Sequence, residues 1–176
     1  VYTGAYDNKI YCLNATNGAL VWMYETEGYV RSSPAVSNGL VYVGSYDRRI
    51  YCLNANNGTL VWSYKTGDTI FSSPAVAGGF VYIGSRDDKV YALNATTGAL
   101  IWSYATGASV ASSPAVARGF AYVGNDIGRI YCLNATSGTL VWTYTTGGQI
   151  DSSATVANGF VYMGAYDNIT YCLNAA

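Results

Sequence analysis

The apolar positions of this chain recur with a period of 40 residues, without insertion or deletion. Within residues 30–66, four short apolar runs are separated by turn signals rich in Asn, Gly and Asp. The runs cover residues 33–37, 40–45, 50–55 and 60–64. Runs of this length, rich in β-branched and aromatic residues and joined by hairpin-length loops, predict four β-strands in each period.

The predicted strands are apolar on both faces, so each small sheet is expected to be covered on both sides. A four-stranded antiparallel sheet that repeats and is buried on both faces is typical of a propeller blade. The sequence therefore predicts an all-β fold, a β-propeller of four-stranded antiparallel blades, with about four to five blades in this chain. We treat residues 1–176 as one domain, made of repeats 1–40, 41–80, 81–120 and 121–160 and a partial repeat, 161–176.

The strand count leaves the end blades incomplete. With strands labelled A to D from the central axis outward, the chain contains A four times, B five times, C five times and D four times. Three arrangements fit: a compact ring of about five incomplete blades, a four-blade ring with a spare terminal hairpin, or completion of that hairpin by a neighbouring subunit. Head-to-tail completion that does not close makes a fibre, whereas the closed version is a two-chain ring of about eight blades.

Two residue types in each repeat have a structural reason. A Trp on strand D is expected to fill the gap between adjacent blades, where full burial of the ring contributes about 3 kcal/mol or more. A Gly in the C–D hairpin is expected to adopt a positive φ, which glycine does without strain. The tryptophans are Trp22, Trp62, Trp102 and Trp142, and the glycines are Gly18, Gly58, Gly98 and Gly138.

The composition of the chain mainly excludes classes of partner. Only 11% of the residues are charged, against roughly 25% in an ordinary domain, and the net charge is −1. We therefore expect neither nucleic acid nor an anionic membrane surface as partner. No apolar run approaches the roughly 18 residues of a membrane span. The chain does not begin with Met, so we expect a processed chain or a fragment.

The four cysteines occupy one register position, at which the third repeat has Ala92; they are Cys12, Cys52, Cys132 and Cys172. Equivalent positions in neighbouring sheets lie at least about 10 Å apart, too far for a disulfide, so each Cys is expected to act as a small buried hydrophobe. The chain has no His and no Cys-x-x-Cys pair. We expect no metal site.

The repeat resembles a known family in its residues. Ile50-Tyr-Cys-Leu-Asn-Ala, followed by a Gly, Leu60-Val-Trp-Ser-Tyr and Thr66-Gly, and then by Ser-Ser-Pro-Ala-Val, is similar to the PQQ-like, or tryptophan-docking, β-propeller repeat. It resembles in particular the regular arrays of prokaryotic surface proteins, many of them archaeal. The resemblance implies propellers of seven or eight blades, and a family that includes quinoprotein alcohol dehydrogenases and the outer-membrane assembly lipoprotein.

Differences between repeats concentrate in the B–C turns and the D–A loops. Strands alternate in direction within a blade, so these loops are expected on one face, which then holds the candidate binding residues. Equivalent positions near the central axis are Arg31, Phe71, Ala111 and Asp151, and the remaining candidates are Tyr29, Asp68, Gln149, Tyr6, Tyr46 and Tyr166. The alternative is that these loops vary because packing does not hold them.

The sequence is compatible with three functions. The first is a non-enzymatic extracellular or cell-surface scaffold or protein-interaction module, with no cofactor, whose partners are itself, in a homo-oligomer or filament, or other surface proteins. Five sequons, at Asn14, Asn57, Asn94, Asn134 and Asn168, favour a secreted glycoprotein. The second is a sugar- or peptide-binding propeller. The least favoured is a piece of a quinoprotein dehydrogenase, because the family enzymes carry an adjacent Cys-Cys pair that this chain lacks.

Overall fold

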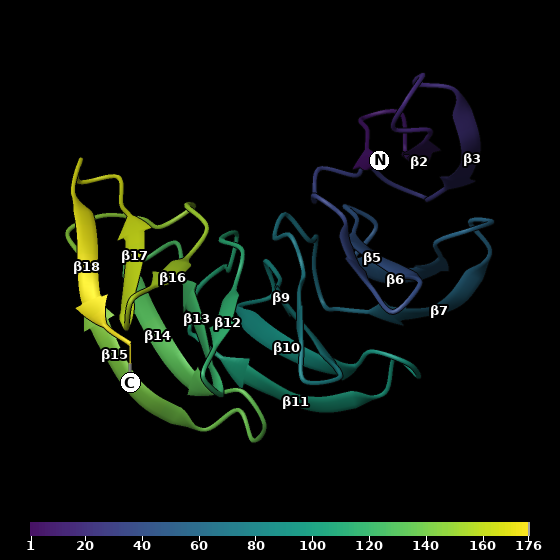
Figure 1. The fold of residues 1–176 in the computed structure, drawn as a ribbon. Coiled ribbons are helices and arrows are strands. Elements are labelled where there is room, and N and C mark those ends of the chain that lie inside the picture. Colours follow the sequence, from purple (N-terminus) through teal and green to yellow (C-terminus); the bar gives the residue numbers. More distant parts are fainter. Residues whose placement is uncertain (176) are drawn as a thin grey trace.

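The computed structural model describes residues 1–175, which form eighteen β-strands and no helix. The strands make five antiparallel sheets that follow one another along an open arc (Figure 1). The first sheet contains β1 (Tyr2–Gly4), β2 (Lys9–Leu13) and β3 (Leu20–Glu25). The second contains β4 (Ala35–Ser37), β5 (Leu40–Gly44), β6 (Arg49–Asn54) and β7 (Leu60–Lys65).

The third sheet contains β8 (Ala75–Ala77), β9 (Phe80–Gly84), β10 (Lys89–Asn94) and β11 (Leu100–Ala105). The fourth contains β12 (Ala115–Ala117), β13 (Phe120–Gly124), β14 (Arg129–Asn134) and β15 (Leu140–Thr145). The fifth contains β16 (Thr155–Ala157), β17 (Phe160–Gly164) and β18 (Thr170–Asn174). The order of strands in each sheet follows the chain, so strands A to D are joined by three hairpins.

Every sheet has the same register. In the second sheet Ala35 lies opposite Tyr42, Tyr42 opposite Cys52, and Cys52 opposite Trp62, with a bulge after Cys52. The C–D hairpins follow the expected turn chemistry: Gly58 has a φ of +71°, and Asn54 Oδ1 accepts hydrogen bonds from the two backbone amides that open the turn. The all-β prediction and the four-stranded sheet are confirmed.

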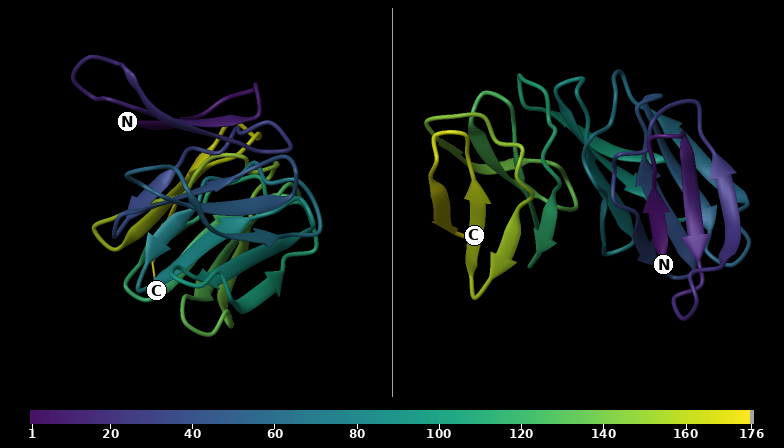
Figure 2. Two further views of the ribbon diagram at one scale, coloured as in Figure 1. Left: turned by 90° about the vertical axis from the view of Figure 1, so that its right-hand side faces the viewer. Right: turned by 90° about the horizontal axis from the view of Figure 1, so that it is seen from above.

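The sheets do not close into a ring. The inner strands β4, β8, β12 and β16 lie next to one another. The segments that lead into the first three are joined by Ser33 N–H to Ser73 Oγ and Ser73 N–H to Ser113 Oγ, each 2.9 Å. Before β16, the Ala154 amide donates to the carbonyl of Ser113 at 3.2 Å. The first and last sheets stand at opposite ends of the arc (Figure 2). The structure therefore shows neither of the two closed single-chain rings, and the number of blades in a closed propeller stays a prediction.

The core lies between sheets, where each face is covered by the next. Strands β9 and β10 are buried along four consecutive residues each, so both of their faces are covered. Trp62 Nε1 and Tyr42 Oη both donate to the carbonyl of Ala95 in the next sheet, at 3.0 and 3.1 Å. Trp22 and Trp102 repeat this contact on Ala55 and Ala135. These three indoles thus dock one sheet onto the next.

Candidate functional site

The loops that vary between repeats meet on one face, because each D–A loop is hydrogen bonded to the B–C turn of the next sheet. The carbonyl of Tyr29 accepts from the amide of Tyr46, and the carbonyl of Ser109 from that of Asp126, both at 2.9 Å. The pairs Thr69–Arg86 and Gln149–Tyr166 repeat the bond. A fixed backbone network therefore carries the variable side chains.

An aspartate in the B–C turn strengthens this network. Asp87 Oδ2 accepts from the Gly67 amide of the preceding sheet at 2.6 Å and from the Tyr91 hydroxyl of its own sheet at 2.5 Å. In the fourth sheet Ile127 replaces the aspartate; Asn125 then caps the turn through the Arg129 amide, and Tyr131 donates to the carbonyl of Thr106. The turn is kept although its side chains change.

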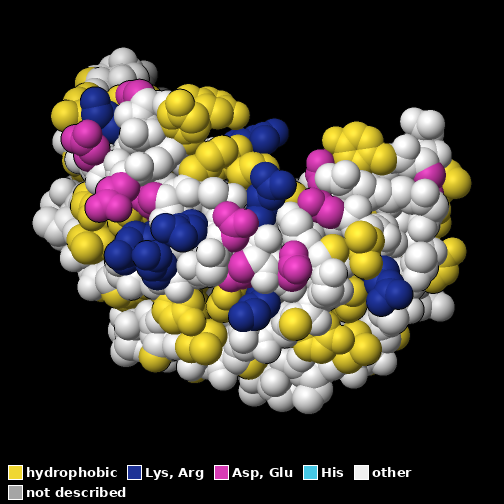
Figure 3. All heavy atoms as spheres, turned by 180° about the vertical axis from the view of Figure 1, so that it is seen from behind, with side chains coloured by type: hydrophobic (Ala, Val, Ile, Leu, Met, Phe, Trp, Pro, Cys, Tyr) yellow, Lys and Arg dark blue, Asp and Glu magenta, His cyan; other side chains and the backbone are white. Residues whose placement is uncertain are grey.

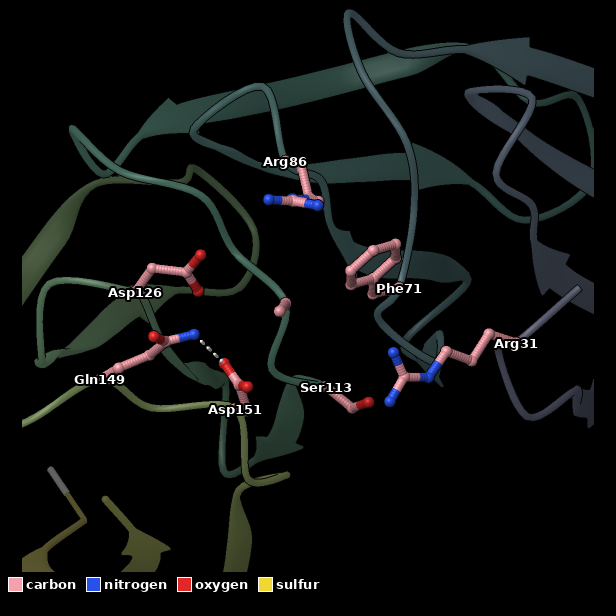
Figure 4. A pocket seen from close by; sticks show the side chains of 8 residues that line it. Arg31, Phe71, Arg86, Ser113, Asp126, Gln149 and Asp151 are labelled. Carbon is pink, nitrogen blue, oxygen red and sulfur yellow. Dashed lines mark hydrogen bonds between the residues drawn. The ribbon is translucent and has the colours of Figure 1, made fainter. Parts of the chain in front are cut away.

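Near the inner strands these loops enclose a cavity of about 240 Å³. Arg31, Phe71 and Arg86 lie on one side of it, and Asp126, Gln149 and Asp151 lie on the other (Figure 4). Ala111 and Ser113 also line the cavity, from the segment that leads into β12. Four successive repeats thus contribute to one space.

Phe71 organises the basic side of the cavity. The guanidinium carbons of Arg86 and Arg31 lie 4.9 and 5.5 Å from the centroid of its ring, within cation–π range. Hydrogen bonding with Tyr46 raises the pKa of Arg31. Arg31 therefore keeps its positive charge at any physiological pH.

On the acidic side of the cavity, hydrogen bonds instead of an aromatic ring hold the charged groups. Asp151 accepts a hydrogen bond from Gln149 Nε2 at 2.8 Å through Oδ1, and one from the Tyr166 hydroxyl at 3.2 Å through Oδ2. Burial raises the pKa of Asp126, while the Ser109 hydroxyl acts in the opposite direction. In the part of the chain that the structure describes, no salt bridge joins these carboxylates to Arg31 or Arg86.

A row of aromatic rings leads from the N-terminal sheet to the cavity. The ring centroids of Tyr6 and Tyr29 lie 5.5 Å apart, those of Tyr29 and Tyr46 lie 5.9 Å apart, and Phe71 is stacked on Tyr46 at 4.5 Å. Tyr6 and Tyr29 remain 63% and 49% exposed. The row is therefore an accessible aromatic surface on the variable face.

Most of the sequence-predicted binding residues gather in these two features. Arg31, Phe71, Gln149 and Asp151 line the cavity, Tyr166 contacts it through Asp151, and Tyr6, Tyr29 and Tyr46 form the row. Asp68 does not line the cavity; its carboxylate accepts from the neighbouring Thr69 amide. Binding by any of these residues stays a prediction.

Sequence reasoning missed Arg86, Asp126 and Ser113. Arg86 and Asp126 occupy the repeat position of Tyr6, Tyr46 and Tyr166, so the 40-residue register identifies their position but not the direction of their side chains. More widely, Lys and Arg side chains alternate with Asp and Glu on the face of the arc seen in Figure 3.

The residues present do not match the quinone site that the family resemblance implies for the enzymes. All four cysteines have free thiols and stand one to a sheet, in the same position of strand C. An adjacent cysteine pair is therefore absent from the cavity. Among residues 1–175, no group of three His, Cys, Asp or Glu side chains is placed to hold a metal ion.

Repeated antiparallel sheets, docked by tryptophans around an inner row of short strands, define a β-propeller repeat protein. A family model described as "Outer membrane protein assembly factor BamB" matches residues 1–108, 66–125 and 107–176. The chain belongs to this family of PQQ-like repeats.

Solved structures show the same fold at low identity. BamB from Moraxella catarrhalis is 20% identical with a TM-score of 0.85, over 99% of this chain and 54% of that one. The computationally designed Ika8 protein is 16% identical with a TM-score of 0.89, over 98% and 54%. The quinohemoprotein alcohol dehydrogenase ADHIIG from Pseudomonas putida HK5 is 21% identical with a TM-score of 0.75, over 83% and 32%.

A curated relative, the beta-alanine-activating enzyme of Danio rerio, is 49% identical over 39 residues, which are 22% of this chain and 3% of that protein. The chain spans about half the length of the BamB and Ika8 structures. Within the described residues there is no helix with the length and hydropathy of a membrane span.

Proposed function

We propose that this chain is a non-enzymatic scaffold that binds other proteins at the cell surface or outside the cell, and that associates with itself through its terminal sheets. The observation that carries the proposal is the division of each repeat into two parts. The contacts that dock one sheet on the next are repeated, as at Trp62 and Trp102, whereas side chains change on the loop face. A constant framework with one variable face is the arrangement expected of an interaction module.

The fifth sheet supports self-association. Cys132 of the fourth sheet is fully buried, while Cys172, at the same position of β18, is exposed. The face that other sheets bury is therefore open here, and Trp142, Tyr144 and Leu173 line a hollow beside β18. Strand β18 also pairs on one side only, with β17, which leaves an edge for another strand.

The outer strands add a second accessible surface. Each begins with two exposed aliphatic residues, as at Leu60 and Val61, which are both 46% exposed. Equivalent pairs stand at Leu20–Val21, Leu100–Ile101 and Leu140–Val141. Four such pairs around the outside of the arc favour contact with protein partners.

The native mass in solution tests self-association. Light scattering on a sizing column, in reducing buffer, is expected to give a mass above the chain mass of 18.7 kDa. Cys172→Lys, which places a charge on the open face of the fifth sheet, is expected to shift the particle towards the single chain. Thr136→Lys is the control, because Thr136 lies in an exposed hairpin turn. A wild-type monomer at all concentrations contradicts self-association.

A second candidate function is the binding of a sugar or a peptide on the variable face. The exposed row of Tyr6, Tyr29 and Tyr46 favours it, because aromatic rings supply binding area at low entropic cost. Titration of the chain with sugars and with short peptides, followed by tyrosine fluorescence, tests this function. If no sugar changes the fluorescence, a peptide remains as the candidate ligand.

A further inference from the structure

We propose that the cavity between Arg31, Arg86, Asp126 and Asp151 binds a peptide segment carrying one acidic and one basic side chain, the acid against the arginines and the base against the aspartates. The inference rests on the proposed protein-binding role of this face. It adds the chemistry of the segment and its orientation.

The basic side of the cavity is prepared for a carboxylate. Two guanidinium groups stand around Phe71, at 4.9 and 5.5 Å from its ring, and their charges are not neutralised by a salt bridge within the described residues. In Figure 4 the guanidinium groups of both arginines point into the space between the two sides. A guanidinium pairs with a carboxylate through two parallel hydrogen bonds, so an acidic side chain fits this side.

The acidic side is prepared for a cation. Gln149 and Tyr166 hold the Asp151 carboxylate in place through one hydrogen bond to each oxygen. Asp126 Oδ1 is buried, and the Ser109 hydroxyl is the neighbouring donor that lowers the pKa of this carboxyl. A carboxylate oxygen can accept more than one hydrogen bond. An ammonium or guanidinium group entering from the cavity supplies further donors.

Charges of both signs on opposite walls exclude simpler ligands. A lone anion at the arginines meets Asp126 and Asp151 across the cavity, and a lone cation meets the arginines. A ligand with both charges satisfies both walls, and mismatched ligands are rejected by like-charge contact. The cavity of about 240 Å³ is open on the loop face and has room for one or two side chains of a partner loop.

Isothermal titration with blocked peptides tests the inference. The probes are acetylated, amidated glycine peptides that carry one Glu and one Lys at separations of one to four residues, together with Glu/Gln, Gln/Lys and Gln/Gln versions. At one separation the Glu/Lys peptide is expected to bind at least tenfold more tightly than any other version, and less tightly as salt is added. Free glutamate and free lysine, tested alone, separate a small zwitterion from a peptide: tight binding of either amino acid overturns the peptide assignment.

Variants then assign the two ends. Arg86→Gln is expected to remove the advantage of Glu over Gln while keeping that of Lys, and Asp151→Asn is expected to do the reverse. Arg118→Gln and Glu25→Gln are matched controls, since both side chains are exposed and lie outside the cavity. Arg86→Lys and Asp151→Glu keep the charges, so they preserve the test if a neutral variant does not fold.

Equal affinity for all four peptides, or loss of affinity in the control variants, overturns the inference. The native mass is measured on the same samples. A chain that self-associates but does not distinguish the peptides refutes only the charge assignment, whereas a monomer that binds the Glu/Lys peptide refutes only self-association.

Discussion

At the scale of the residue, the contact between sheets depends on one indole and one glycine. A Cβ added at Gly98 would stand 2.6 Å from Cδ2 of Trp62, and one at Gly138 would stand equally close to Trp102. Gly18 has the same φ of +71° but nothing within 4 Å, because it lies in the first sheet. Glycine thus has two roles in this turn: it adopts the positive φ, and it leaves space for the indole of the neighbouring sheet.

Gly98→Ala and Gly18→Ala separate these roles. Both replacements force alanine into the left-handed region, which costs about 1 kcal/mol. Gly98→Ala also displaces the Trp62 ring, so we expect it to lower the free energy of unfolding by at least about 1 kcal/mol more than Gly18→Ala does. Denaturant unfolding followed by tryptophan fluorescence measures both. Equal losses would mean that the indole does not rest on the turn.

Buried tyrosines predict a loss of stability in alkali. Burial raises the pKa of Tyr42 from 10.0 to about 12, with Cys52 acting in the same direction. The raised value means that the folded state keeps the proton which the unfolded state loses, so this stabilisation is complete below pH 10 and is lost as the pH rises towards 12.

Tyr42→Phe is therefore expected to flatten the fall in the free energy of unfolding between pH 10 and 12. At neutral pH it is expected to cost about 1 kcal/mol, for the hydrogen bond to Ala95. Tyr6→Phe is the control, because its ring is exposed. Parallel pH profiles for wild type and Tyr42→Phe would contradict the prediction.

Residue identity at the cavity could be anticipated only in part. Positions 31, 71, 111 and 151 follow from the register, since equivalent positions in consecutive repeats converge on the inner strands. Arg86 and Asp126 look like loop drift in the sequence, because they replace tyrosine. Their significance depends on the direction in which the side chains point, which the loop-to-loop hydrogen bonds determine.

At the scale of the element, the B–C turn keeps its shape with two different sets of side chains. Asp87 links its own strand and the preceding sheet, whereas the fourth sheet achieves the same turn with Asn125 and an exposed Ile127. The strands themselves were predictable from the period, because every apolar run is bounded by turn residues. The curvature of the arc was not, because it sums small rotations between sheets that no single run encodes.

Asp87→Ala and Ile127→Ala compare the two forms of the B–C turn. Asp87→Ala leaves the Gly67 amide and the Tyr91 hydroxyl without their acceptor, so we expect a loss of about 1–3 kcal/mol of unfolding free energy. Ile127 is 55% exposed, and its removal is expected to change the stability by less than about 0.5 kcal/mol. Thermal unfolding by circular dichroism measures both. A similar cost for the two would show that the aspartate adds nothing to the turn.

At the scale of the whole molecule, burial falls from the middle of the arc to its end. Strand β9 is buried at four of its five residues, but the equivalent strand β17 at only two. Strand β18 has no fully buried residue, in contrast to β10. Stability in such an array is a sum of units and nearest-neighbour contacts, so a sheet with one neighbour is less stable than a sheet with two.

Amide hydrogen exchange is expected to follow this gradient, with slower exchange in β9 and β10 than in β17 and β18 by at least tenfold. Mass spectrometry of peptides from the two regions, on dilute protein, measures the difference. The equivalent sequences make each central strand the control for its terminal counterpart. Uniform protection in a dilute monomer would contradict the prediction.

The row of serines along the inner strands has a consequence for how such a chain can change. Each link joins residues 40 positions apart, as from Ser33 to Ser73, and involves only the next sheet. Removing or duplicating one whole repeat therefore recreates junctions that already exist. Recombination between the repeats of a gene can lengthen or shorten the arc in whole steps, whereas the loss of a single codon shifts every later side chain of a strand to the opposite face.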